Sequence, residues 1–277
     1  MNREKIKVFQ KSIRTWYRHH APNLPWRTTK NPWHVLVSEV MLQQTQIPRV
    51  LKKYPEFLRR FPTPQALAKA PWGTVLNSWQ GMGYNRRAKY LQNAAHIIST
   101  EHHGIVPQGT ETLDALPGIG PYSARAIACF AYNRCEPFIE TNIRRTVIHT
   151  FFSHKKNIPD VAILLVLKKI EPRTKNREWY LALMDYGRDA IKNVPNPNRK
   201  SKHYTRQSRF AGSDRYIRGK IIQLLIANGN LPLKRVHQEL HEDPHLSKLT
   251  APKTKNILAS LLKENIIRQE DHKYSID

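Results

Sequence analysis

The stretch LPGIGPYSARAIA, residues 116–128, decides the fold. Gly118 and Gly120 stand directly before Pro121, and the apolar spacing that follows predicts a helix over residues 121–132. Because glycine has no Cβ, the turn allows close approach to its backbone, and the N–H groups and positive dipole end of a helix suit an anion. A lone G-x-G is a weak signal, since an ordinary turn between two helices has the same appearance. The turn therefore predicts a phosphate contact only if the rest of the chain indicates a polyanionic partner.

The chain carries a large excess of positive charge. Its 277 residues contain 46 Lys and Arg against 21 Asp and Glu, which gives a formal net charge of +25 and an isoelectric point near 10.2. Such an excess repels itself unless a polyanion neutralises it, and the usual polyanion is nucleic acid. A ribosomal or membrane-surface protein is the alternative, but 40% hydrophobic content and six tryptophans indicate a real core. Nucleic acid is therefore the expected partner.

Length, termini and cysteines narrow the class further. The chain is long enough for two compact domains and a small appendage. Its N-terminus has no apolar signal segment and no run of eighteen apolar residues follows, so we expect an intracellular protein, cytoplasmic or nucleoid-associated, with no membrane partner. Cys129 and Cys135 have no third or fourth cysteine with which to complete a metal site, and we predict that both are buried small hydrophobic residues.

Helical periodicity dominates up to about residue 195, and strand signals are nearly absent there. The expected helices cover residues 4–19, 32–46, 47–60, 65–70, 73–80, 85–100, 112–115, 121–132, 141–152, 160–171 and 177–191. This pattern predicts an all-α domain over residues 1–195. Residues 196–213 are rich in Lys and Arg and cannot form an apolar face, so we predict a solvated basic linker that can lie on DNA.

Residues 214–277 have a different pattern. A helix capped by Ser213 or Asp214 should end at Gly229, two shorter helices follow, and the last twelve residues can pair as a β-ribbon. Three helices and a ribbon predict a small winged-helix-like module, and a plain packing appendage is the alternative. The start of the candidate recognition helix carries Lys253, Lys255 and Asn256.

The segments around the hairpin carry a resemblance to a known family. VSEVMLQQTQIPRV (37–50), WQGMGYNRRAKYLQNAA (79–95) and ETNIRR (140–145), together with the LPGIG turn, resemble the helix-hairpin-helix (HhH-GPD) DNA glycosylase superfamily in order and spacing. The resemblance covers roughly residues 20–195. LPWR (24–27), SEVMLQQT (38–45) and FPT (61–63) look most like the adenine DNA glycosylase (MutY) branch. It implies a two-lobed helix-hairpin-helix DNA glycosylase fold, with residues 1–25 packing with residues 130–195.

The resemblance also implies catalytic residues whose chemistry can be checked. Removal of a base needs an acid that protonates the leaving base and a negative charge near an oxocarbenium-like sugar. Glu39 lies in an otherwise apolar helix, where burial raises a carboxyl pKa, and it stands at the position of the family's proton donor. Glu140 falls where the superfamily has its catalytic aspartate, and Asn142 where MutY has an active-site asparagine. We therefore expect Glu39 to be the general acid and Glu140 to stabilise the sugar cation, directly or through a water.

Alternatives remain for both acids. Glu39 can be a helix-interior glutamate paired with an arginine, and Glu140 can be a structural helix cap. The extra methylene of Glu140, relative to the family aspartate, can move its carboxylate by about an ångström, which can lower a rate roughly a hundredfold. Tyr122 stands where bifunctional members have a lysine nucleophile, and a phenol cannot form a Schiff base. The resemblance therefore implies a monofunctional enzyme without lyase activity.

A base inside a duplex must be flipped out before it reaches Glu39, and polar residues of the family wedge into the vacated stack. The expected partner is double-stranded DNA, bound by a monomer. The residues expected to contact DNA are Gln43, Gln44, Thr45, Tyr84, Leu116, Gly118, Ile119, Gly120 and Arg144. In the family, backbone carbonyls of the hairpin hold an alkali cation. No side-chain metal site is expected.

Two departures from the family limit the assignment of a substrate. The stretch after MDYG (184–187) lacks the four cysteines that most relatives use for a [4Fe–4S] cluster, so we expect no cluster and no other cofactor. Residues 214–277 are too few for the Nudix-like domain with which MutY senses 8-oxoguanine. The leading hypothesis is base excision repair of adenine opposite 8-oxoguanine or guanine. Another base, such as hypoxanthine, or uracil or thymine opposite guanine, and a non-catalytic DNA-binding module are the alternatives.

Overall fold

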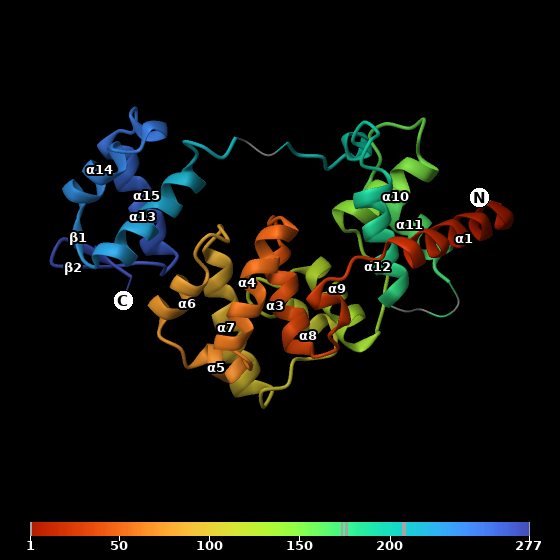
Figure 1. Ribbon diagram of the computed structural model, residues 1–277, viewed down its shortest axis with the longest axis horizontal. Helices are drawn as coiled ribbons and strands as arrows, with labels where there is room; N and C mark the ends of the chain where they lie inside the picture. The colour runs from red at the N-terminus through yellow and green to blue at the C-terminus, as the bar shows by residue number, and fades with distance from the viewer. Residues whose placement is uncertain (1, 173, 175–176, 207–208, 277) are drawn as a thin grey trace. The chain divides into compact units, whose positions relative to one another are not determined.

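The protein folds as two compact, mostly helical units (Figure 1). The computed structural model describes residues 2–172, 174, 177–206 and 209–276. Unit 1 contains Met1–Glu39 and Pro107–Arg206, and unit 2 contains Val40–Val106 and Gln207–Asp277. Helices account for almost all of the regular structure up to residue 206, which confirms the predicted all-α class.

Unit 1 contains the hairpin and all four predicted catalytic residues. Its helices are α1 (Arg3–His20), α2 (Pro25–Thr28), the part of α3 (Pro32–Leu42) up to Glu39, α8 (Thr110–Asp114), α9 (Pro121–Tyr132), α10 (Thr141–Phe151), α11 (Asp160–Ile170) and α12 (Arg177–Asp185), followed by a π-helical turn, η1 (Tyr186–Ala190), and a 3₁₀ turn, η2 (Pro197–Lys200).

Aromatic side chains join the N-terminal helix to the later helices of unit 1. The Phe9 ring of α1 lies edge-on to Phe151 and to Trp179, with centroids 5.0 and 6.1 Å apart. Phe138 stacks on Tyr180 at 4.8 Å in the same buried cluster. Helix α1 thus packs into a core made largely by residues 126–183.

The hairpin between α8 and α9 is built on the glycines of the LPGIG turn. Gly118 has φ +77, a conformation that side chains other than glycine rarely adopt, and the Ile119 amide donates to the Leu116 carbonyl at 3.1 Å. Pro121 begins α9 at a position where its missing N–H costs nothing. The sequence pattern therefore dictates both the turn and the helix start.

The two cysteines differ from the prediction in one respect. Both are buried, but Cys129 and Cys135 form a disulfide bond, so they are not the unbonded small hydrophobic residues that we predicted. Asn133 ends α9 in the left-handed conformation, with φ +57, and this reversal brings Cys135 back to the helix end with a Cα–Cα distance of 4.2 Å.

The predicted solvated linker begins later than residue 196. Pro197 and Asn198 are buried, and the Lys202 amide donates to the Ile158 carbonyl at 2.9 Å. The absence of an apolar face misled the prediction, because polar contacts hold this segment to unit 1. The Asn198 side-chain amide donates to the Thr141 carbonyl at 3.0 Å, and Arg144 donates to the Ser201 hydroxyl at 2.9 Å.

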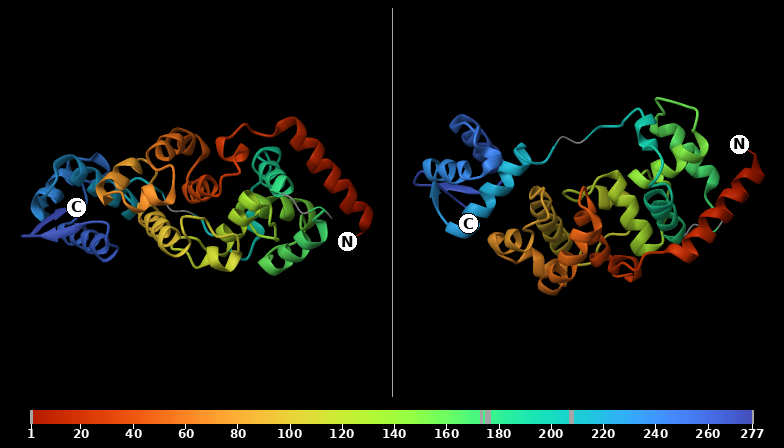
Figure 2. Two further views of the ribbon diagram at one scale, coloured as in Figure 1. Left: turned by 90° about the horizontal axis from the view of Figure 1, so that it is seen from below. Right: turned by 45° about the horizontal axis from the view of Figure 1, so that its top comes forward.

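Unit 2 combines a helical lobe with the C-terminal module. The lobe contains the end of α3, α4 (Ile47–Arg60), α5 (Pro64–Ala68), α6 (Trp72–Ser78) and α7 (Arg86–Glu101). The module contains α13 (Asp214–Asn228), β1 (Leu231–Pro232), α14 (Leu233–His241), the 3₁₀ turn η3 (Pro244–Leu246), α15 (Ala251–Lys263), β2 (Arg268–Glu270) and β3 (Lys273–Ser275). Its strands form an antiparallel sheet in the order β1-β3-β2, and Tyr274 lies opposite both Leu231 and Gln269. Figure 2 shows the module in blue, with its short strands beside its helices.

The module has the predicted helices and ribbon, with Ser213 as the N-cap of α13. The short strand β1 was not predicted, because two residues give no periodic signal. The module shares its core with the lobe, since Leu76 of α6 is buried among module residues such as Ile221 and Leu258. The indole of Trp72 also donates to the Ile266 carbonyl at 2.8 Å.

One expected helix is shorter than its apolar pattern suggests. We predicted a helix over residues 32–46, but α3 ends at Leu42 and Gln44 adopts φ +53. A left-handed residue interrupts the hydrogen-bond ladder, and the carbonyls at the end of α3 bond to a side chain from α7 instead.

Among the described residues, no helix is both long and apolar enough to cross a membrane.

Candidate active site

Glu39 of α3 is a buried acid in unit 1. Only 6% of its surface is exposed, and its neighbours Val35 and Leu36 are fully buried and apolar. Burial raises the pKa of Glu39 to about 7, and the charge of Glu140 acts in the same direction. The Arg27 guanidinium and the Tyr122 hydroxyl oppose this rise in pKa. Glu39 makes no ion pair among the described residues, so Arg27 acts on it at longer range.

Tyr122 connects the hairpin to this acid. It follows Pro121 in the first turn of α9, and its hydroxyl donates to the Glu39 Oε2 atom at 3.3 Å. Burial, followed by the charges of Glu39 and Glu140, raises the pKa of Tyr122 well above its ordinary value. Tyr122 is therefore a neutral hydrogen-bond donor at physiological pH.

Glu140 is the N-cap of α10. Its Oε2 atom accepts from the amides of Asn142 and Ile143 at 2.6 and 3.2 Å, and its Oε1 atom accepts from the Asn142 side-chain amide at 3.0 Å. Burial raises the pKa of Glu140, while these hydrogen bonds and Arg27 oppose the rise. The capping geometry fixes the carboxylate in one orientation, and its charge still acts on Glu39. Glu140 can therefore cap α10 and also act electrostatically on Glu39.

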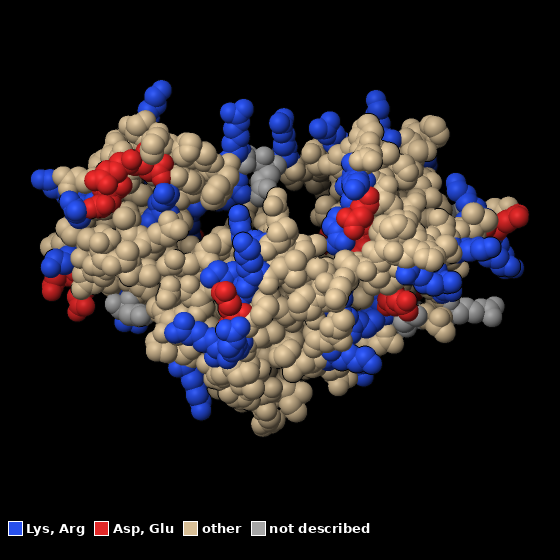
Figure 3. Space-filling model, viewed as in Figure 1, with Lys and Arg blue, Asp and Glu red and all other residues tan. Residues whose placement is uncertain are grey.

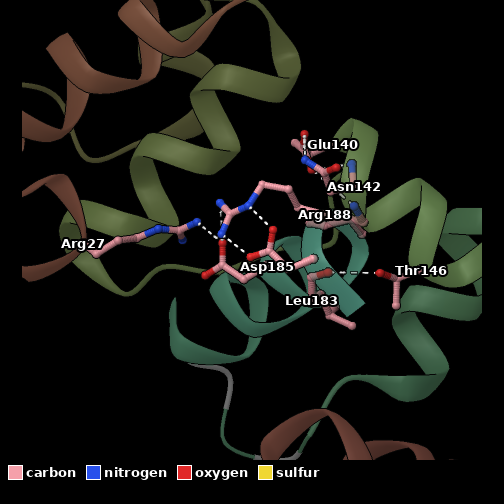
Figure 4. Close-up of polar contacts among 9 residues, drawn as sticks. Arg27, Glu140, Asn142, Thr146, Leu183, Asp185 and Arg188 are labelled. Atoms are coloured by element: carbon pink, nitrogen blue, oxygen red, sulfur yellow. Dashed lines mark hydrogen bonds and ion pairs between the residues drawn. The ribbon is translucent and has the colours of Figure 1, made fainter. Parts of the chain in front are cut away.

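Two arginines and two aspartates form a network of ion pairs in the same unit as Glu140 and Asn142 (Figure 4). Asp185 is fully buried, and its Oδ1 atom pairs with Arg27 at 2.9 Å and with Arg188 at 3.0 Å. Arg188 also binds Asp189 at 2.6 Å. Burial raises the pKa of Asp185, and both arginines oppose this effect. Within the described chain, Arg27 Nε and Asp185 Oδ2 are buried without a hydrogen-bond partner, so the network has one donor and one acceptor to spare.

Gly187 permits the close approach of η1 to α10. A Cβ on this residue would lie 2.1 Å from the Asn142 carbonyl oxygen and 2.6 Å from the Thr146 hydroxyl. The same hydroxyl donates to the Leu183 carbonyl at 3.0 Å, which ties α10 to α12, the helix directly before η1 (Figure 4). This glycine therefore places Arg188 and its partners beside the helix that Glu140 caps.

Unit 1 also contains residues of the hairpin and an arginine that we predicted to contact DNA. Leu116 and Ile119 are 3% and 4% exposed, so their side chains are packed inside the protein. A Cβ on Gly120 would meet nothing within 4 Å, which leaves open space at the turn. Arg144 pairs with Asp160 and donates to Ser201, so its guanidinium is committed to contacts within the protein.

The predicted contact residues of unit 2 are held together by a side chain that sequence reasoning missed. Arg87 is 8% exposed, and the two terminal amino groups of its guanidinium lie within hydrogen-bond distance of six acceptors. The acceptors are the carbonyls of Val40, Met41 and Gln43 at 2.8, 2.9 and 2.6 Å, the Thr45 hydroxyl at 2.9 Å, and the carbonyls of Met82 and Gly83 at 2.9 and 3.0 Å. Gln43, Gln44 and Thr45 therefore lie beside the turn that carries Tyr84, which has φ +47.

Basic side chains outnumber acidic ones on the face shown in Figure 3. In the described ranges, no group of three His, Cys, Asp or Glu side chains could hold a metal ion. The lack of a cofactor and the alkali cation on the hairpin carbonyls remain predictions. The sequence did not predict the ion pairs of Asp185 with Arg27 and Arg188, although Arg27 lies in LPWR and Asp185 in MDYG. The only sequence feature that could have indicated these pairs is the presence of an arginine and an aspartate in otherwise apolar segments.

Comparisons with known proteins identify the family of this chain. The family model of the HhH-GPD superfamily base excision DNA repair protein matches residues 37–172. The adenine DNA glycosylase of Mycobacterium tuberculosis is 35% identical over 260 residues, which cover 83% of this chain and 82% of the relative. The thymine-DNA glycosylase of Aeropyrum pernix is 30% identical over 195 residues, which cover 68% of this chain and 87% of the relative.

Solved structures give the same result for the fold. The structure of a thermostable thymine-DNA glycosylase matches with a TM-score of 0.62 and 25% identity, over 70% of this chain and 91% of that chain. This match confirms the predicted helix-hairpin-helix glycosylase fold, and the sequence relatives confirm the predicted resemblance to MutY. The chain belongs to the HhH-GPD superfamily of base excision DNA repair proteins.

Proposed function

We propose that this protein is a monofunctional DNA glycosylase, which hydrolyses the N-glycosidic bond of a base flipped out of double-stranded DNA, with adenine opposite 8-oxoguanine or guanine as the leading substrate. Its superfamily makes it a base excision repair protein. The proposal depends on one observation above all: Glu39 is buried with a pKa of about 7, and the fixed carboxylate of Glu140 acts on it. Two carboxyl groups in different environments can act as a proton donor and as a stabiliser of positive charge.

The geometry suggests a role for each group. Glu39 gives its proton to the leaving base as the bond from C1′ to nitrogen breaks, and the Tyr122 hydroxyl stabilises the carboxylate that results. The Glu140 carboxylate, held by the two amides of α10, stabilises positive charge on the sugar, directly or through the attacking water. Water adds to C1′, and one of its protons passes to a carboxylate, which completes the hydrolysis.

The absence of lyase activity follows from the chemistry of Tyr122. A Schiff base needs an amine, whereas this phenol donates to Glu39 and has a raised pKa. The product is therefore an abasic site in an intact strand. Covalent trapping on DNA by borohydride, at the efficiency of a bifunctional glycosylase, would contradict this part of the proposal.

Adenine is the leading base because relatives near 35% identity are named adenine DNA glycosylases. Thymine opposite guanine is the second candidate, because one relative and one similar structure are named thymine-DNA glycosylases.

Single-turnover base release tests the proposal. The duplex panel contains adenine opposite 8-oxoguanine and opposite guanine, and hypoxanthine, uracil and thymine mismatches. We expect release of one base by the wild type, with the rate lowered at least about a hundredfold in Glu39→Gln and in Glu140→Gln. Glu136→Gln, which alters an exposed acid paired with Arg125, is the matched control and should keep the wild-type rate.

Each other outcome has a definite meaning. A full rate in Glu140→Gln would reduce this residue to a helix cap. Tight binding of every duplex without release of any base would replace the enzyme by a non-catalytic DNA-binding module.

A further inference from the structure

Tyr84 sits in a backbone conformation that needs support. It follows two glycines with positive φ, Gly81 at +82 and Gly83 at +69, and itself has φ +47. A tyrosine in the left-handed region is uncommon and costs conformational energy, so neighbouring groups must hold it there.

Two guanidinium groups provide that support. The Arg87 guanidinium carbon lies 5.6 Å from the Tyr84 ring centroid, and that of Arg215 lies 5.5 Å from it. Arg215 also donates a hydrogen bond to the Tyr84 hydroxyl. Arg87 is itself fixed by its carbonyl and hydroxyl acceptors in the lobe. Arg215, in contrast, lies in the first turn of α13, so the C-terminal module supplies one of the two guanidinium groups that contact this ring.

The module is docked so that Arg215 has a defined position. Leu76 is buried in the module core and Trp72 donates to the Ile266 carbonyl. Glu264 of the module accepts from Arg218 at 2.5 Å and lies 3.9 Å from Arg86, which comes two residues after Tyr84. The module therefore contacts the chain on both sides of the Tyr84 turn.

The C-terminal module carries little net positive charge with which to bind a polyanion. Residues 214–277 contain 11 Lys and Arg against eight Asp and Glu, a net charge of +3, whereas the whole chain carries +25. Lys253, at the start of the candidate recognition helix α15, pairs with Asp214 at 2.7 Å. The specific contact of the module with the Tyr84 turn is thus a better-supported role than phosphate binding by α15.

We infer that Arg215 is a positioning residue, through which the C-terminal module fixes Tyr84 and sets the preference for the base opposite the target. This inference rests on the proposed glycosylase function for its effect on base preference, although the hold of Arg215 on Tyr84 does not depend on it. A ring held at its hydroxyl and by two guanidinium groups has little freedom to rotate. Fixed placement makes such a contact discriminating, because poorly fitting bases cannot be accommodated by rotation of the ring.

The first readout needs no DNA. In the full-length protein, we expect amide hydrogen exchange over residues 81–86 to become about tenfold faster in Arg215→Ala, because the turn loses a hydrogen bond and a cation–π contact. Arg235→Ala is the matched control, since it removes an exposed arginine of the same module that pairs only with Glu239 among the described residues. Equal exchange in the two variants would overturn the inference.

The second readout is the ratio of single-turnover rates for the same target opposite two different bases. We expect Arg215→Ala and Tyr84→Ala to change this ratio by a similar factor of about five to ten, and Arg215→Lys to restore part of it. The double variant should change it no further than either single variant. Additive effects, or a ratio in Arg215→Ala equal to that in Arg235→Ala, would show that Arg215 does not act through Tyr84. Failure of the wild type to release any base would refute the proposed function, and hydrogen exchange would still decide whether Arg215 holds Tyr84.

Discussion

At the scale of single residues, the proton on Glu39 decides the pH range of the reaction. Because burial raises the pKa of Glu39 to about 7, the carboxyl is largely protonated at pH 6 and largely ionised at pH 8. A general acid works only while it holds its proton. We therefore expect the single-turnover rate to fall about tenfold per pH unit above pH 7.5, and to fall again at acid pH, where the Glu140 carboxylate, whose pKa burial raises, takes up a proton. A rate that rises through pH 8 would mean that Glu39 acts as a base instead.

The same pKa predicts how the stability of the protein depends on pH. The folded-state pKa of Glu39 lies above its ordinary value of 4.5, so its contribution is fully present below pH 4.5 and is lost as the pH rises through 7. At pH 8 the buried charge costs at most about 3 kcal/mol. Urea unfolding should therefore show that Glu39→Gln gains stability over the wild type between pH 5 and pH 8. The exposed Glu111→Gln variant should show no such gain.

Tyr122 tunes this acid. Its hydrogen bond lowers the pKa of Glu39, so Tyr122→Phe should move the alkaline fall of the rate to higher pH. The carboxylate formed after proton transfer also loses a donor, which should slow base release about tenfold at pH 6. Tyr132→Phe, at the other end of α9, is the matched control and should leave the pH profile unchanged. An unshifted profile in Tyr122→Phe would show that this hydroxyl does not act on Glu39.

The residues that sequence reasoning identified and those that it missed differ in a physical way. Glu39 and Glu140 stand inside local motifs that resemble those of the superfamily, so the resemblance points to them. Arg27 and Asp185 are 158 residues apart, and only the folded chain brings them together. Arg87 likewise meets acceptors more than 40 residues away at the end of α3. A local pattern cannot predict which distant carbonyls a buried guanidinium will satisfy.

At the scale of elements, the crossing of η1 and α10 depends on a single missing methyl group. Gly187→Ala would place a Cβ 2.1 Å from the Asn142 carbonyl oxygen, so the two elements must separate. We expect a loss of about 1–3 kcal/mol in the free energy of unfolding, and slower base release because Asn142 and the Glu140 cap move together.

Gly219→Ala provides the matched control for that substitution. Gly219 lies within α13, and a Cβ there would meet nothing within 4 Å. Alanine in a helix interior should stabilise the protein by about 0.5–1 kcal/mol and leave the rate unchanged. Equal stability changes in the two variants would show that Gly187 is not at a close helix crossing.

Helix positions were predictable wherever an apolar period and a cap coincide, as for α9, α10 and α13. The predictions failed where tertiary polar contacts replace such signals. α3 ends early because Gln44 adopts the left-handed conformation and Arg87 bonds the freed carbonyls. Residues 196–202 fold because Asn198 and Ser201 find partners in α10, which no apolar pattern announces.

At the scale of the whole molecule, positive charge is distributed unevenly along the chain. The module of residues 214–277 has a net charge of +3, and the 18 residues of the basic segment 196–213 alone have +5, with five Lys and Arg and no acid. The affinity for DNA should therefore come mainly from residues before 214. Removing one contact between a basic side chain and a DNA phosphate lowers the slope of log affinity against log salt by about 0.9.

Because the charge is uneven, an experiment can distinguish two roles of the module, which are the positioning of Tyr84 and direct binding of DNA. If the module mainly positions Tyr84, replacing both Lys253 and Lys255 of α15 by alanine should leave the salt slope within about 0.5 of the wild type. Replacing the exposed Arg206 and Arg209 should lower it by up to about 1.8, because two charges next to the glycosylase domain are then removed. Fluorescence anisotropy with a fixed duplex between about 50 and 200 mM salt measures both slopes. A decrease of about 1.8 in the lysine variant would instead make α15 a DNA-reading helix, and the module would bind the polyanion directly.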